Sequence, residues 1–140
     1  MANTIQVDIV SAEGEIYSGA ATMVFLPAKE GEMGVAPRHA PLLALLKAGE
    51  VRVQTVEGPE LSFYVGGGAL EVQPTKVTVL ADTAARAADL DEAAALAARQ
   101  RAEEVLAGKI DKIEQAEALA ELVRAAAQLK MIERLRKIKG

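Results

Sequence analysis

The sequence contains no cysteine and no tryptophan, and its only histidine is His39. These absences exclude a disulfide framework, a thiolate nucleophile and a zinc–cysteine site. A single histidine also excludes a histidine cluster around a metal within one chain. No apolar run reaches the roughly 18 residues that span a bilayer. The first ten residues lack the features of a signal or transit peptide, so we expect no targeting segment there.

Charge and composition limit the classes of protein further. The 140 residues are 51% hydrophobic and 26% charged, which excludes a disordered chain. The net charge is −4 and the isoelectric point is about 5.1. An acidic chain of this kind is not expected to bind duplex nucleic acid as its main partner.

The composition changes near residue 81. All five prolines and nine of the eleven glycines precede it, whereas 18 of the 28 alanines lie in the last 60 residues. Valine, glycine and proline favour strands and tight turns, and alanine favours helices. The sequence therefore predicts a β domain over residues 1–84 and an α domain over residues 85–140.

The first part shows the alternation of polar and apolar residues that is typical of strands. Short segments of this kind are separated by glycine- and proline-containing turns, which predicts a sandwich or a flattened barrel. The clearest segments are residues 5–9, 51–55, 61–65, 69–72 and 76–80.

The second part predicts an antiparallel hairpin of two helices. Asp89 and Glu92 form a capping box for a helix that runs to about Leu106 and ends at Gly108. Asp111 and Glu114 repeat the box for a second helix that reaches about Lys137. The expected apolar face of the first helix offers mostly methyl groups, from Leu90, Ala94, Ala97, Ala98 and Val105. That of the second is a stripe at three-to-four spacing, formed by Leu122, Ala126, Leu129 and Ile132.

Two segments contain residues that also occur in catalytic or phosphate-binding loops. His39 is a candidate general base, but no serine or cysteine lies in its loop, which favours a turn histidine that bonds locally or contacts a partner. The triplet Gly66, Gly67 and Gly68 precedes a strand-like segment rather than a helix. It therefore indicates a bulge or a close backbone approach more than a phosphate loop.

Acidic and basic residues form two further candidate sites. Glu30 and Glu32 flank Gly31 in a predicted turn, whose acidic tip either faces solvent or meets a basic partner. Residues 124–140 carry a net charge of +5, while the rest of the chain carries −9. A helix dipole accounts for cations in the last turn only, so the basic stretch predicts an acidic partner or a membrane surface. The apolar stripe beside it is narrow and lacks interfacial aromatics, which favours a protein partner over lipid. Its cations include Arg124, Lys130, Arg134 and Arg136.

Three long motifs in this order resemble the epsilon subunit of bacterial F-type ATP synthases. They are PAKEGEMGVAPRHAPLL at residues 27–43, YVGGGALEV followed by VTVLAD at residues 64–72 and 77–82, and DLDEA at residues 89–93. The resemblance covers nearly the whole chain. It implies a sandwich of about ten short strands followed by a two-helix hairpin.

The resemblance also implies a place on the central rotor, without an active site of its own. The gamma subunit would bind near His39, and the ring of c subunits would contact Glu30, Gly31 and Glu32. The hairpin would extend toward the alpha and beta subunits and restrain ATP hydrolysis, with Arg124, Lys130, Arg134 and Arg136 facing beta. The implied location is peripheral, on the cytoplasmic side of the bacterial inner membrane, with proton transport as the process served.

Some members of the family bind ATP through Ile/Leu-Asp-x-x-Arg-Ala. Leu90, Asp91 and Ala95 match this motif, but Ala94 replaces the arginine that would pair with phosphate. We therefore expect no cofactor. The alternative function is an ATP-sensing module whose hairpin closes on nucleotide. A third is an enzyme that uses His39, but no nucleophile, metal cluster or cofactor loop accompanies that histidine.

Overall fold

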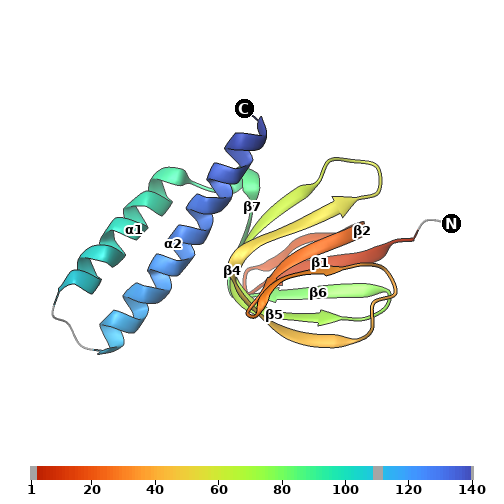
Figure 1. Cartoon of the computed structure of the whole chain (residues 1–140), viewed down its shortest axis with the longest axis horizontal. Coiled ribbons are helices and arrows are strands. Elements are labelled where there is room, and N and C mark those ends of the chain that lie inside the picture. The colour runs from red at the N-terminus through yellow and green to blue at the C-terminus, as the bar shows by residue number, and fades with distance from the viewer. Residues whose placement is uncertain (1–2, 109–111, 140) are drawn as a thin grey trace. The chain divides into compact units, whose positions relative to one another are not determined.

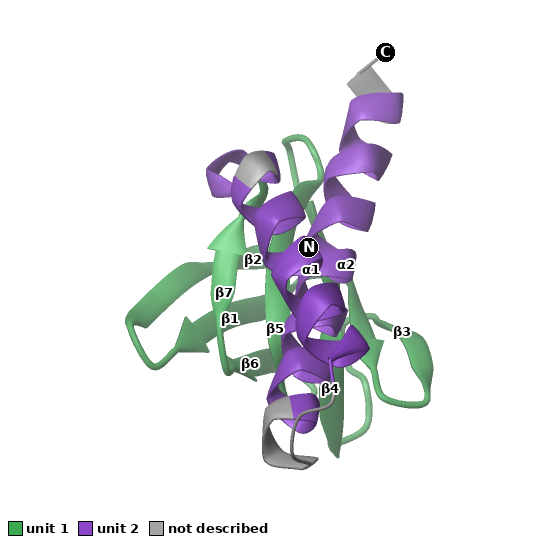
Figure 2. Ribbon diagram, turned by 90° about the vertical axis from the view of Figure 1, so that its left-hand side faces the viewer, with its two compact units in different colours: residues 1–87 green, residues 88–140 purple. Residues whose placement is uncertain are grey.

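The computed structural model describes residues 3–108 and 112–139. The chain forms two compact units, residues 1–87 and residues 88–140 (Figure 2). The first unit contains all the strands, and the second contains both α-helices (Figure 1). The change of composition near residue 81 therefore lies close to the division between a β unit and an α unit. Among the described residues, no helix is both long enough and apolar enough to cross a membrane.

The first unit has seven strands in its described part. They are β1 (Ile5–Ser11), β2 (Gly14–Ala28), β3 (Gly31–Val35), β4 (Leu42–Thr55), β5 (Leu61–Val72), β6 (Lys76–Ala81) and β7 (Ala84–Arg86). Their order is β1-β6-β5-β4-β2-β3, and β1 also pairs with β2, which closes the sheet on itself. The predicted β-sandwich or flattened barrel is thus confirmed.

The strand count differs from the expected ten short strands. Strands β2, β4 and β5 span 15, 14 and 12 residues. Gly49 precedes the segment 51–55, where a glycine-containing turn is expected, but Ala48 and Gly49 both continue β4 and pair with β5. Irregular register between β2 and β4 lets the long strands bend instead of ending. Segments that look like separate strands in the sequence are therefore halves of one.

The core of the first unit is built mainly from valine, isoleucine and leucine. Ile5, Val7 and Ile9 of β1 are fully buried, as their alternation with polar residues predicts. Most of the other buried residues come from the same alternation on β2, β4, β5 and β6, namely Val24, Leu26, Val51, Val53, Val65, Leu70, Val72, Val77 and Val79. Burial of each such side chain stabilises the fold by about 1.5–3 kcal/mol, so this unit has a core of its own.

The second unit is a helical hairpin of α1 (Glu92–Ala107) and α2 (Lys112–Lys139). Gly108 ends α1 as expected, but the cap at its start is Asp91 rather than Asp89. The Asp91 side chain accepts a hydrogen bond from the amide of Ala94 at 3.1 Å, while Asp89 lies in a 3-10 turn (Ala87–Asp89). The second predicted box, with Asp111 and Glu114, lies outside the residues whose side chains are described.

The two helices meet along a seam of small side chains. Among the hairpin side chains that the structure describes, the buried ones are Ala95, Ala102, Ala118, Ala125 and Met131. The predicted faces were partly wrong, because Ala94, Ala97, Val105 and Ala126 are exposed, whereas Leu90, Ala98, Leu122, Leu129 and Ile132 are half-buried. Alanine is so frequent in both helices that hydrophobicity does not mark one face. The packing uses alanines seven residues apart, which return to the same side of a helix.

Candidate functional site

The acidic segment at residues 30–32 forms the tip of a tight hairpin. Ala28 of β2 pairs with Gly31 of β3, so only Lys29 and Glu30 make the turn. Gly31 has a φ of 137°, which a side chain would strain. The amide of Lys29 donates to the carbonyl of Leu45 at 2.9 Å and ties the turn to β4. The side chains of Glu30 and Glu32 are both exposed, as predicted for an acidic tip.

Glu32 is held by an arginine that the sequence analysis did not single out. The Arg52 guanidinium on β4 lies 2.5 Å from Glu32 Oε1 and 3.5 Å from Glu60 Oε1. It also stacks over the Phe25 ring at 4.5 Å from the centroid. Arg52 and Glu32 are 20 residues apart in sequence, so no local pattern connects them. The only available signal is the alternation of Arg52 with Val51 and Val53, which places it on the outer face of its strand.

His39 lies in the loop between β3 and β4. Its Nδ1 donates to the carbonyl of Ala40 at 2.8 Å, the local bond expected of a turn histidine. The preceding residue, Arg38, is the one described non-glycine residue with a positive φ, at 67°. The Arg38 amide donates to Pro74 at 2.8 Å, which connects this loop to the turn between β5 and β6. These hydrogen bonds hold the loop in place, as a surface that contacts a partner protein requires.

The glycine triplet lies inside β5 and forms no phosphate loop. Gly66 and Gly68 pair with Ala48 and Leu46 of β4. A Cβ on Gly68 would lie 2.1 Å from the carbonyl oxygen of Leu80, so the two backbones approach too closely for any side chain. This is the close backbone approach that the sequence predicted.

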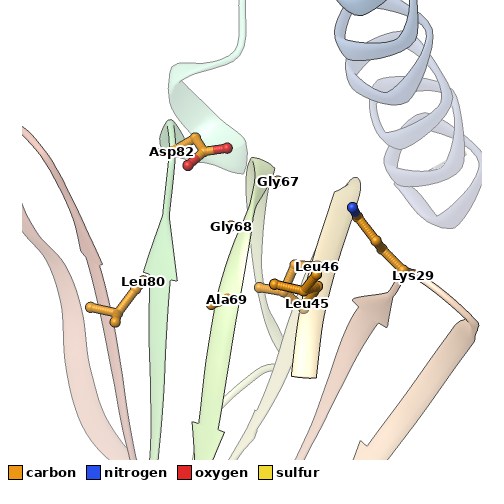
Figure 3. A pocket seen from close by; sticks show the side chains of 8 residues that line it. All are labelled: Lys29, Leu45, Leu46, Gly67, Gly68, Ala69, Leu80 and Asp82. Carbon is orange, nitrogen blue, oxygen red and sulfur yellow. The ribbon is translucent and has the colours of Figure 1, made fainter. Parts of the chain in front are cut away.

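An apolar row crosses the outer face of the first unit. Leu45, Ala69 and Leu80 are aligned across β4, β5 and β6, and the two leucines are more than half exposed. They border an open hollow of about 420 Å³, shown in Figure 3 with Lys29 and Asp82 on opposite sides. Leu43, two residues before Leu45, is 75% exposed. Exposed leucines gathered on one face are typical of a protein-binding surface.

The three candidate nucleotide-binding residues have structural roles in the hairpin. Asp91 caps α1, Ala95 is 2% exposed in the seam with α2, and Leu90 is half-buried. A ligand that bound through Asp91 and Ala95 would have to break the cap of α1 and open the seam between the helices. No cluster of three metal-ligating side chains occurs in the described part of the chain.

The basic stretch of α2 is partly paired with acids of the hairpin itself. Arg136 forms an ion pair with Glu92 in the first turn of α1. A second pair between the helices joins Arg101 to Glu121 at 3.3 Å. Lys137 pairs with Glu133 one turn away on α2 at 3.5 Å. Arg124 and Lys130 are exposed, and Arg134 is half-buried.

Comparison with known proteins agrees with the two-unit organisation. Residues 4–87 match the beta-sandwich domain of the ATP synthase delta/epsilon chain, and residues 88–133 match its long alpha-helix domain. The chain belongs to the ATP synthase delta/epsilon chain family. The resemblance seen in the sequence is thereby confirmed, and as a member of this family the chain is a non-catalytic subunit of an ATP synthase.

Relatives and solved structures of this family extend over nearly the whole chain. The ATP synthase epsilon chain of Nitrosococcus oceani is 63% identical over 140 residues and covers 100% of both chains. That of Alkalilimnicola ehrlichii is 59% identical over 135 residues, with 96% of each chain covered.

Two solved structures share the fold at low identity. A chain of the Euglena gracilis mitochondrial ATP synthase has a TM-score of 0.71 at 18% identity, covering 100% of this chain and 84% of its own. A chain of the Tetrahymena thermophila mitochondrial ATP synthase central stalk and c-ring has a TM-score of 0.60 at 14% identity. The match covers 91% of this chain and 96% of that one.

Proposed function

We propose that this subunit is part of the central rotor of a proton-translocating ATP synthase. The first unit binds the gamma subunit and rests on the c-ring, on the cytoplasmic side of a bacterial inner membrane. The hairpin of α1 and α2 extends toward the alpha and beta subunits and restrains ATP hydrolysis. Membership of the epsilon-chain family and the division into two units support this proposal.

The first unit offers a separate surface to each of its two rotor partners. The exposed tip at Glu30, Gly31 and Glu32 would contact the polar loops of the c-ring. The loop around His39 would lie against gamma. The outward leucines of β4 and β6 would add apolar contact area for gamma, since such a face is otherwise left in water.

The alanine seam is the observation that carries the regulatory part of the proposal. A buried methyl group contributes about 0.8 kcal/mol, whereas a buried leucine contributes about 1.5–3 kcal/mol. The two ion pairs between the helices have mostly exposed side chains and add about 0–1 kcal/mol each. The helices can therefore separate at modest cost.

The open hairpin must gain contacts elsewhere, because only differential binding shifts such an equilibrium. Exposed apolar residues of the helices, among them Leu96, Leu119 and Val123, and the half-buried Leu122, Leu129 and Ile132 would find new partners there. Arg124, Lys130, Arg134 and Arg136 would pair with acidic groups on beta. Arg136 would have to exchange Glu92 for such a group.

Removal of residues 88–140 from the assembled ATP synthase tests this function. We expect ATP synthesis to be retained and ATP hydrolysis to be faster. Charge reversal of Arg134 and Arg136 to glutamate should relieve the restraint in the full-length subunit. Unchanged hydrolysis in both variants would contradict the regulatory role of the hairpin, and failure to assemble would contradict the separate role of the first unit.

A further inference from the structure

Arg52 is the centre of a stack of side chains on the outer face of the first unit. Three strands lie side by side there in the order β4, β2, β3. Arg52 of β4 is directly opposite Phe25 of β2, and Phe25 is directly opposite Gly34 of β3. The Arg52 guanidinium lies over the Phe25 ring, and from there it reaches Glu32.

Gly34 provides the space that this stack requires. A Cβ at Gly34 would lie 3.2 Å from Cε1 of Phe25 and 2.7 Å from Cε of Met23. The missing side chain leaves room for the Phe25 ring beside Gly34, and the ring supports the guanidinium. Glu60 Oε1 lies 3.5 Å from Nη1 of Arg52, whereas Glu32 contacts Nη2. A planar guanidinium suits this arrangement because it stacks on an aromatic ring and forms fixed hydrogen bonds at its edge.

The stack acts on a side chain that has little other support. The Glu32 side chain is 60% exposed and lies on a strand of only five residues, whereas the Arg52 side chain is 26% exposed. An exposed glutamate that is not held samples many rotamers and loses that freedom when it binds. Arg52 has already removed much of this freedom in the unbound protein.

We propose that Arg52 is a positioning residue for partner binding, which holds the Glu32 carboxylate and the β2–β3 tip in the orientation that the c-ring loop recognises. This inference rests on the proposed contact between residues 30–32 and the c-ring. Glu30, at the turn itself, then supplies an exposed carboxylate, and Glu32 supplies one whose direction is fixed by Arg52.

A double-mutant cycle on Arg52 and Glu32 tests the proposal. The full-length chain, bound to gamma, is titrated onto purified c-ring in detergent. We expect Arg52→Gln and Glu32→Gln each to weaken the affinity about 3- to 10-fold. In the double variant Arg52→Gln should add less than 2-fold to the loss from Glu32→Gln, because Arg52 acts only through Glu32.

Two further variants separate positioning from charge and from folding. Arg52→Lys keeps the positive charge but loses the stacked plane, so it should recover only part of the affinity. Glu60→Gln removes the other ion pair of Arg52 and should leave c-ring affinity unchanged. Thermal unfolding of every variant shows whether a loss of affinity follows a loss of fold.

The outcomes distinguish this inference from the function on which it rests. If Glu30→Gln and Glu32→Gln both leave the affinity unchanged, the c-ring contact itself is wrong. If they weaken binding but Arg52→Gln does not, or if its effect adds fully to that of Glu32→Gln, only the positioning role of Arg52 is overturned.

Discussion

Gly68 is the residue whose backbone position leaves least freedom for substitution. Its φ is 135°, and a Cβ would lie 2.1 Å from the Leu80 carbonyl oxygen and 2.9 Å from Cα of Ala81. Both obstacles are backbone atoms, which cannot move aside without separating β5 from β6. We expect Gly68→Ala to lower the free energy of unfolding by about 3 kcal/mol or more, measured by urea denaturation.

Gly14 provides the matched control for this prediction. It has a similar φ of 128°, but nothing lies within 4 Å of a Cβ built there. Gly14→Ala should therefore cost only the conformational strain, about 1 kcal/mol. Equal losses in the two variants would mean that strain alone, and not the close approach of the strands, explains Gly68.

Asp8 makes the stability of the first unit depend on pH. Hydrogen bonds from Ser18 and Gln6, with Lys76 at 3.0 Å, hold the pKa of Asp8 below its ordinary value. Because the folded pKa lies below the unfolded one, this stabilisation is complete above the unfolded value of about 3.9 and is lost as pH falls through the folded pKa. We expect Asp8→Asn to lower the free energy of unfolding by about 1 kcal/mol at pH 7, and the difference to shrink toward pH 3 or below.

Urea denaturation across this pH range checks the prediction for Asp8. The exposed turn residue Glu57 supplies a control with the same loss of charge. Glu57→Gln should leave the stability at pH 7 nearly unchanged. A loss from Asp8→Asn that stays constant down to low pH would contradict the electrostatic explanation.

Single residues could be assigned from the sequence where their role is local. The neighbours of His39 in sequence explain why it bonds within its turn, and the strand-like segment after Gly68 indicates that the glycine triplet lies in a strand rather than in a phosphate loop. The role of Arg52 could not be assigned in this way. Its partners Phe25 and Glu32 become neighbours only through the register of three strands, which depends on the closed sheet as a whole.

At the scale of elements, the ion pair between Glu92 and Arg136 joins the first turn of α1 to the last turn of α2. Glu92→Gln removes this pair and leaves Arg136 available to beta. An exposed pair contributes about 0.5 kcal/mol, so the open hairpin should gain about 2-fold in population. We therefore expect stronger inhibition of ATP hydrolysis from Glu92→Gln, in contrast to the relief expected from Arg136→Glu.

The distance between the helices gives a direct measurement of this effect. The sequence contains no cysteine, so spin labels can be attached at cysteines introduced at the exposed positions Ala97 and Ala126. Glu103 is a suitable control, since among the described residues its ion pair is with Arg99 of the same helix and does not join the two helices. If Glu103→Gln opens the hairpin as much as Glu92→Gln does, loss of helix stability, rather than loss of the pair, is responsible.

The types of the elements followed from the sequence, but several of their limits did not. The box at Asp89 and Glu92 matched the capping pattern better than Asp91 does, because position 94 is alanine. The structure nevertheless starts α1 after Asp91, since residues 87–89 form a 3-10 turn. The long strands were divided for a related reason, because a glycine marks a turn and a bend in a continuous strand equally well.

At the scale of the whole molecule, the change in composition has a direct physical meaning. Valine-rich strands bury large side chains and form a core, whereas the alanine-rich helices bury mostly methyl groups. The first unit should therefore be stable without the second, whereas the hairpin should be only marginally stable by itself. The proposed function requires such a division, with one unit that binds the rotor firmly and helices that change state.

Unfolding experiments on the full chain and on residues 1–87 test this division. We expect residues 1–87 to unfold cooperatively within a few degrees of the main calorimetric transition of the full chain, because the strands form their core without the helices. Residues 88–140 alone should lose most of their helical circular dichroism, since a hairpin of this size buries too little apolar surface. A fall of more than about 8 °C for residues 1–87 would mean that the first unit is not stable without the second, which would contradict the division into a rotor-binding unit and a regulatory hairpin.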